Sequence, residues 1–143
     1  MQTRIKVLMA DDEPEVLEIM AKRVAREGYV VVTAKDGEEA WAKIQQEDPD
    51  VILLDLMMPK MDGMAVLQNL RHSPPTDKWQ PVIIVSARDE FDDVQHGFSL
   101  QADHYLTKPC QAVEVVRAIK AMIKLIPQHR TSEEAPDEEP PSS

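Results

Sequence analysis

The sequence predicts an α/β fold of five β-strand and α-helix units, a (βα)5 arrangement wound on both faces of one parallel sheet. Three observations support this prediction. Short apolar segments alternate with one-sided amphipathic segments up to residue 126. The apolar segments are nearly continuous rather than interrupted by polar residues, as expected for strands that are covered on both faces. Charged or hydroxyl residues follow most of them, as at the ligand-binding edge of a doubly wound sheet.

Five apolar segments are predicted to be strands. Most are rich in β-branched residues, which favour extended backbone. They cover residues 5–10, 29–34, 51–54, 82–85 and 104–107. Parallel strands need crossover connections, which are right-handed. We assume the strand order 2-1-3-4-5 from the fold class, since the sequence does not state it.

The segments that follow the strands are predicted to be helices. The first, residues 13–26, carries apolar residues at helical spacing and ends before Gly28. The second, residues 36–47, opens with an Asp-Gly turn and glutamates, which suit a helix N-terminus. The remaining helices are expected at residues 63–71, 90–100 and 111–126.

Composition narrows the class of protein. With 143 residues, 43% of them hydrophobic, the chain can form one domain with a real core. Its net charge of −10 argues against direct binding of nucleic acid or of an anionic membrane, both of which need a basic face. A single cysteine, Cys110, and the lack of a leader or an 18-residue apolar run lead us to expect a cytoplasmic protein.

The end of the chain has a different composition. Residues 127–143 are rich in proline and acidic residues and contain no aliphatic side chain larger than alanine. Such a segment cannot offset its ordering entropy by burial. We therefore predict a folded domain over residues 1–126 and a disordered acidic, proline-rich tail or linker over residues 127–143.

Polar side chains gather where the predicted strands end. Carboxylates follow the first and third strands, a hydroxyl follows the fourth and an ammonium group follows the fifth: Asp11, Asp12, Asp55, Ser86 and Lys108. In the assumed strand order these strands are neighbours, so the side chains would converge on one edge of the sheet.

This combination of groups predicts phosphoryl chemistry. Crowded aspartates repel one another, and a divalent cation relieves the repulsion. Hard oxygen ligands with room for water and phosphate indicate Mg²⁺ rather than Zn²⁺. Lys108 and Ser86 would bind further phosphate oxygens. Asp55 is then the predicted nucleophile, which would form an aspartyl-phosphate.

Four motifs that carry these residues resemble the response-regulator receiver domain of two-component signalling. They are VLMADDEPEV, VILLDLMMPKMDGM, VIIVSA and ADHYLTKP, in the order and at the spacing of that family. The resemblance covers about residues 4–126 and implies a flavodoxin/CheY-like fold. It implies that Asp55 is the phosphoacceptor, and that Asp11 and Asp12 are the acidic pair that binds the metal, with Asp12 the more direct ligand.

The resemblance implies further roles. The backbone carbonyl of Met57 completes the metal shell, and the backbone N–H of Ala87 helps Lys108 hold the phosphoryl group. Ser86 is the switch hydroxyl, and Tyr105 is the switch aromatic residue, whose ring moves inward when the hydroxyl is drawn to the phosphate. The peptide bond between Lys108 and the next residue, a proline, is expected to be cis. Cys110 departs from the family, because a bulky apolar residue is usual there.

The predicted function is a phosphorylation-controlled switch. A sensor histidine kinase or a histidine phosphotransfer protein would pass a phosphoryl group from its phosphohistidine to Asp55 with Mg²⁺. Phosphorylation would then reshape the surface of the fourth helix, fifth strand and fifth helix for an unknown downstream protein. Such a protein is not a turnover enzyme, since it catalyses only its own phosphotransfer and slow autodephosphorylation. The chain is expected to be a stand-alone receiver or the receiver part of a longer chain.

Other functions fit the residues less well. A receiver-like interaction module that works without phosphate is the main alternative, although every acceptor-site residue is present. A phosphatase of the haloacid-dehalogenase type needs an acid two residues after its nucleophile, where this chain has Met57. A flavodoxin-like cofactor binder needs a phosphate loop after the first strand, where Asp11, Asp12 and Glu13 would repel a phosphate.

Overall fold

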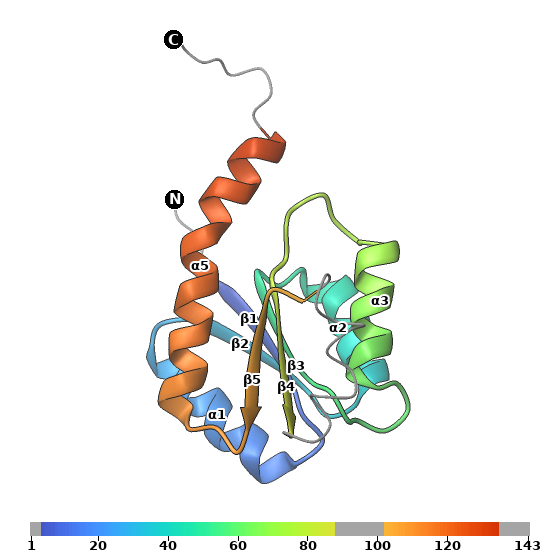
Figure 1. Ribbon diagram of the computed structural model, residues 1–143, viewed down its shortest axis with the longest axis vertical. Helices are drawn as coiled ribbons and strands as arrows, with labels where there is room; N and C mark the ends of the chain where they lie inside the picture. The colour runs from blue at the N-terminus through green and yellow to red at the C-terminus, as the bar shows by residue number, and fades with distance from the viewer. Residues whose placement is uncertain (1–3, 88–101, 135–143) are drawn as a thin grey trace.

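The computed structural model describes residues 4–87 and 102–134 and shows one parallel sheet with helices on both faces (Figure 1). The strand order is β2-β1-β3-β4-β5, and every neighbouring pair is parallel. The strands are β1 (Lys6–Ala10), β2 (Val30–Ala34), β3 (Val51–Asp55), β4 (Val82–Ala87) and β5 (His104–Lys108). The predicted fold class and strand order are therefore confirmed.

Helices cover the two faces of the sheet in pairs. The helices are α1 (Pro14–Arg26), α2 (Gly37–Glu47), α3 (Gly63–His72) and α5 (Ala112–Glu134). Figure 1 shows α1 and α5 on one face and α2 and α3 on the other. The helix predicted over residues 90–100 lies outside the described residues. No helix in the described ranges has the length and apolar character that a membrane span requires.

The last helix is longer than the sequence predicted. Its expected end was residue 126, with a disordered segment after it, but the backbone stays helical through Pro127 to Glu134. The predicted helix end is wrong, whereas the assignment of residues 127–143 to a tail or linker stays a prediction. An interior proline lacks a backbone donor and its ring clashes with the carbonyl of the preceding turn, but the glutamine, arginine and glutamates that follow are good helix formers. Residues 135–143 lie outside the described part of the chain.

Alternate residues of the strands pack on opposite faces of the sheet. In β3, Ile52 and Leu54 belong to the core under α2 and α3, whereas Val51 and Leu53 belong to the core under α1 and α5. Every residue of β3 is buried, including Asp55 at its carboxyl end. The apolar strand therefore determines where this carboxylate lies.

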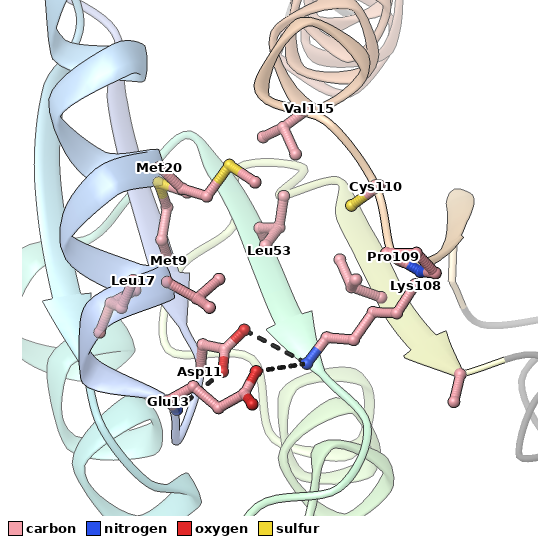
Figure 2. A pocket seen from close by; sticks show the side chains of 13 residues that line it. Met9, Asp11, Glu13, Leu17, Met20, Leu53, Lys108, Pro109, Cys110 and Val115 are labelled. Atoms are coloured by element: carbon pink, nitrogen blue, oxygen red, sulfur yellow. Dashed lines mark hydrogen bonds and ion pairs between the residues drawn. The ribbon is translucent and has the colours of Figure 1, made fainter.

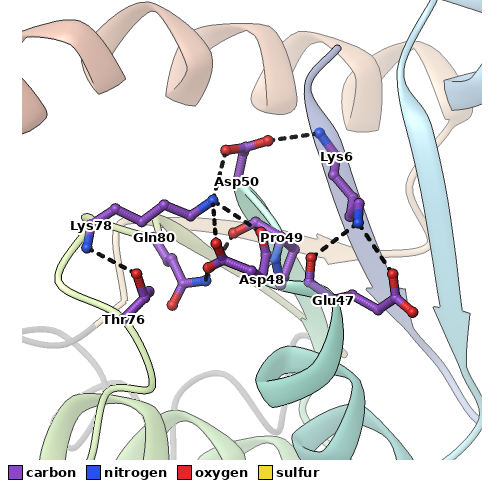
Figure 3. A network of polar contacts seen from close by, with 8 residues as sticks. All are labelled: Lys6, Glu47, Asp48, Pro49, Asp50, Thr76, Lys78 and Gln80. Atoms are coloured by element: carbon purple, nitrogen blue, oxygen red, sulfur yellow. Dashed lines mark hydrogen bonds and ion pairs between the residues drawn. The ribbon is translucent and has the colours of Figure 1, made fainter. Parts of the chain in front are cut away.

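A network of polar contacts joins the amino ends of β1 and β3 to the connection between α3 and β4 (Figure 3). The carboxylate of Asp50 accepts hydrogen bonds from the backbone N–H of Lys6 at 2.8 Å and from Nζ of Lys78 at 3.1 Å. Lys78 also donates to the backbone carbonyl of Asp48 at 2.9 Å. This lysine anchors residues 73–81, a connection to which the sequence assigned no role.

We expect Lys78→Met to lower the free energy of unfolding by about 1–2 kcal/mol, because Asp50 and Asp48 lose an ammonium partner in a partly buried place. The side chains of Lys78 and Asp50 are only 20% and 16% exposed. Urea unfolding at pH 7 measures the change.

The matched control is Lys22→Met. It removes the ion pair between Lys22 and Glu18, whose side chains are 72% and 68% exposed. Such a pair is worth less than about 0.5 kcal/mol. Equal losses in the two variants would show that the Lys78 network contributes no more than a surface pair.

Candidate functional site

Three aspartates meet at the carboxyl ends of β1 and β3. One carboxylate oxygen from each of Asp11, Asp12 and Asp55 lies within 4.8 Å of the other two. Asp11 and Asp55 are buried, and Asp12 is exposed. Hard oxygen ligands that are open to solvent on one side suit Mg²⁺, which keeps several of its waters. The sequence predicted that these three carboxylates would converge on this edge of the sheet.

Lys108, at the end of β5, reaches into this group of carboxylates. Its Nζ lies 3.0 Å from Oδ2 of Asp55 and 3.4 Å from Oδ2 of Asp11. Figure 2 shows the lysine side chain extending toward Asp11 and Glu13. The ammonium group neutralises part of the negative charge that the aspartates concentrate at this edge.

The electrostatics of Asp55 follow from its burial. Burial raises the pKa of Asp55 to about 6, the hydrogen bond from Lys108 opposes the rise, and the charges of Asp11 and Asp12 add to it. Burial alone would lower the pKa of Lys108, but its hydrogen bond to Asp55 and the nearby carboxylate charges raise it overall. The lysine therefore stays charged, and a second cation would favour the ionised form of Asp55.

The loop after β3 packs closely against the backbone of Asp55. The N–H of Gly63 donates to the carbonyl of Leu56 at 2.8 Å. A Cβ on Gly63 would lie 2.5 Å from the carbonyl oxygen of Asp55, so no larger residue fits without a shift of backbone. Met57 lies in this loop with its side chain 55% exposed. The metal-binding role of its carbonyl stays a prediction.

The remaining predicted site residues lie on β4 and β5, most of them at the carboxyl ends of these strands. The register pairs Ala87 with Lys108, so the two residues lie side by side on neighbouring strands. Ser86 is buried, and its hydroxyl donates to the carbonyl of Ala87 at 3.1 Å. Tyr105 is half-buried and packs against the core under α2 and α3. The peptide bond between Lys108 and Pro109 is cis, as predicted.

Glu13 also belongs to the site, although the sequence predicted no individual role for it. Its carboxylate lies 3.8 Å from Nζ of Lys108. Its backbone N–H donates to Oδ1 of Asp11 at 2.9 Å, which orients that carboxylate. Its position directly after Asp12, at the turn into α1, is the feature of the sequence that could have indicated this role.

Comparisons with known proteins agree with this fold and show the family. Residues 7–120 match the family described as "Response regulator receiver domain". The receiver domain of the Francisella response regulator 1452 superposes with a TM-score of 0.75 at 34% identity, over 85% of this chain and 98% of that one. The chain belongs to the response regulator receiver domain family, and the predicted resemblance is confirmed.

Several of the longer relatives are named as regulators of transcription. The alkaline phosphatase synthesis transcriptional regulatory protein PhoP of Bacillus subtilis is 40% identical over 119 residues, which is 83% of this chain and 48% of PhoP. The probable transcriptional regulator ycf27 of Guillardia theta is 41% identical over 124 residues, 87% of this chain and 47% of that protein. The chain thus spans about half the length of the curated relatives it matches.

We expect Asp55→Asn to raise the free energy of unfolding at pH 7, without Mg²⁺, by about 1–3 kcal/mol. The ordinary pKa of the carboxyl is 3.8, and the folded protein raises it to about 6. The folded state therefore binds a proton more tightly than the unfolded state, and wild-type stability falls as the pH rises from about 4 to about 6.

Urea unfolding at a series of pH values tests this expectation. The advantage of the variant should be full above about pH 6 and should disappear toward pH 4, because wild-type Asp55 is then protonated. Asp77→Asn, at an exposed loop position, is the control and should change stability by less than about 0.5 kcal/mol at any pH. A gain that does not depend on pH would contradict the raised pKa.

Proposed function

We propose that this chain is a phosphoacceptor switch of two-component signalling and that Asp55 receives the phosphoryl group. The observation that carries the proposal is the buried carboxylate of Asp55, 3.0 Å from Nζ of Lys108 and beside Asp11 and Asp12. Receiver domains are generally phosphoacceptors, and histidine kinases phosphorylate response regulators. The donor is accordingly a phosphohistidine of a sensor histidine kinase or of a histidine phosphotransfer protein.

The transfer is a displacement at phosphorus. A carboxylate oxygen of Asp55 attacks, the bond between phosphorus and the histidine nitrogen breaks, and its electron pair returns to the imidazole. Lys108 exchanges its contact with Asp55 for a phosphoryl oxygen. The backbone N–H of Ala87, next to Lys108 in the sheet, donates to the phosphoryl group as it arrives.

The acidic group is proposed to bind Mg²⁺. The ligands would be Asp11, Asp12, Asp55 and the backbone carbonyl of Met57, and their chemistry fits a hard cation that prefers oxygen. When bound, Mg²⁺ supplies positive charge that lowers the repulsion between Asp55 and the incoming phosphate. The carboxylates and Lys108 of this chain orient the acceptor oxygen.

The switch is proposed to involve Ser86 and Tyr105. The hydroxyl of Ser86 would leave the carbonyl of Ala87 and donate to the phosphoryl group. The ring of Tyr105, half-buried on the adjacent strand, would then move inward. This rearrangement would favour one of two states of the surface formed by β5, α5 and the helix expected over residues 90–100, and so change its affinity for a downstream protein.

The proposal also includes the domain boundaries and the cellular location. The receiver domain would occupy residues 1–126 of a cytoplasmic protein, and residues 127–143 would be a tail or linker that is helical at its start. A net charge of −10 disfavours direct contact with nucleic acid. Control of transcription, suggested by the names of the relatives, would therefore act through another domain or protein.

Intact-protein mass spectrometry after incubation with acetyl phosphate or phosphoramidate tests the acceptor chemistry. We expect the wild type to gain one phosphoryl group only when Mg²⁺ is present, because the crowded carboxylates otherwise repel the phosphate. Asp55→Asn should gain none. The control Asp62→Asn, which alters the exposed N-cap of α3, should be modified like the wild type.

If no condition modifies the wild type, the acceptor function is excluded. A receiver-like module that binds partners without phosphate would then be the remaining function. Modification that persists in Asp55→Asn would instead move the acceptor to another residue.

A second experiment concerns the lifetime of the phosphoryl group. The exposed side chain of Met57 offers no hydrogen bond to orient an attacking water, so we expect slow autodephosphorylation. Met57→Glu and Met57→Asn should accelerate the loss of the phosphoryl group by roughly tenfold, an effect within the range of positioned polar side chains. Met57→Leu, the apolar control, should leave the rate unchanged. Equal rates in all the variants would contradict this role.

A further inference from the structure

An apolar pocket of about 530 Å³ lies beside the acidic site, between α1 and α5 (Figure 2). Its floor is formed by strand residues, and its walls by the two helices and the segment after β5. Most of the lining is apolar: Met9, Leu17, Met20, Leu53, Val85 and Val115. The pocket lies on the face of the sheet opposite to α2 and α3, so it is separate from the surface that holds Tyr105.

The small side chain of Cys110 helps to leave this space open. Cys110 lines the pocket directly after Pro109 and is half-buried. Burial raises the pKa of its thiol, and the charge of Glu114 adds to the rise, so the thiol faces an apolar environment as a neutral group. A larger apolar side chain at this position would project into the pocket.

The rim of the pocket is charged and has a net negative character. Asp11, Glu13 and Lys108 line this rim, with two carboxylates against one ammonium group. The ammonium group is already shared with Asp55, which lies 3.0 Å from it. The carboxylates of Asp12 and Asp55 lie close to that of Asp11 and add to the negative potential.

We infer that this pocket binds a small amphiphilic cation, with an apolar ring between α1 and α5 and a protonated amine at the rim near Asp11 and Glu13. The volume falls within the range of ligand pockets, which are mostly apolar with a few polar groups at defined places. Apolar cavities much smaller than this one bind apolar ring molecules. The carboxylates select against an anion of the same shape.

Methyl NMR with labelled methionines locates the ligand. Tryptamine, an indole with a protonated amine, is the probe, and indole-3-propionate is its anionic counterpart. In buffer without Mg²⁺, which would compete for the same carboxylates, tryptamine should shift the methyl signals of Met9 and Met20, which line the pocket. Met58 and Met122 are buried outside it and should not move. The dissociation constant of tryptamine should be at least about tenfold lower than that of indole-3-propionate, a difference of about 1.4 kcal/mol.

Two variants separate the apolar pocket from its charged rim. Cys110→Phe places a ring in part of the pocket and should weaken binding of both probes, with circular dichroism as the check on folding. Glu13→Gln should reduce the preference for tryptamine over indole-3-propionate by about threefold or more, the effect of one nearby charge. Glu15→Gln is the matched control, since this exposed residue of α1 does not line the pocket and should leave the preference unchanged.

Three outcomes would overturn the inference. The first is the absence of shifts at Met9 and Met20 at millimolar tryptamine. The second is equal binding of the anion and the cation, and the third is binding that is not weakened in folded Cys110→Phe. If Cys110→Phe does not fold, the methyl shifts of the wild type and the Glu13→Gln preference decide the matter. In addition, alkylation of Cys110, the single cysteine of the chain, should slow when tryptamine is bound.

Discussion

The ion pair between Asp55 and Lys108 is the interaction on which the rest of the site depends. Asp55 is only 3% exposed, and an isolated carboxylate in such a place would be neutralised by a proton. Lys108, 3.0 Å away, supplies part of the charge that keeps an ionised form accessible. Lys108 offsets only part of the effect of burial, because the pKa of Asp55 is still raised to about 6. A further positive charge beside Asp55 would therefore favour its ionised form.

The architecture around this pair is arranged to hold it rigidly. β3 is buried on both faces, so Asp55 cannot move without disturbing two packed cores. Gly63 allows the following loop to approach the carbonyl of Asp55 more closely than any side chain would permit. At the opposite ends of the strands, the contacts of Lys78 with Asp50 tie a long connection to the sheet.

The same edge carries two chemically different spaces. The carboxylate group suits a hydrated cation and a phosphate, whereas the adjoining pocket suits an apolar body. Asp11, Glu13 and Lys108 form the boundary between them. A molecule in the apolar pocket would thus lie against Lys108, the residue that contacts Asp55.

The sequence by itself determined the order of strands and helices in the described residues and the acidic edge, because apolar periodicity and strand-end residues are local patterns. The family followed from the resemblance of four motifs. The sequence placed Asp11, Asp12, Asp55, Ser86 and Lys108 correctly at the ends of their strands. Only the tertiary structure decided the rest. The contact of Glu13 with Lys108 and the pocket beside Cys110 depend on how distant elements pack. No local pattern records those distances, since they arise only when the sheet brings residues from far apart in the chain to one edge.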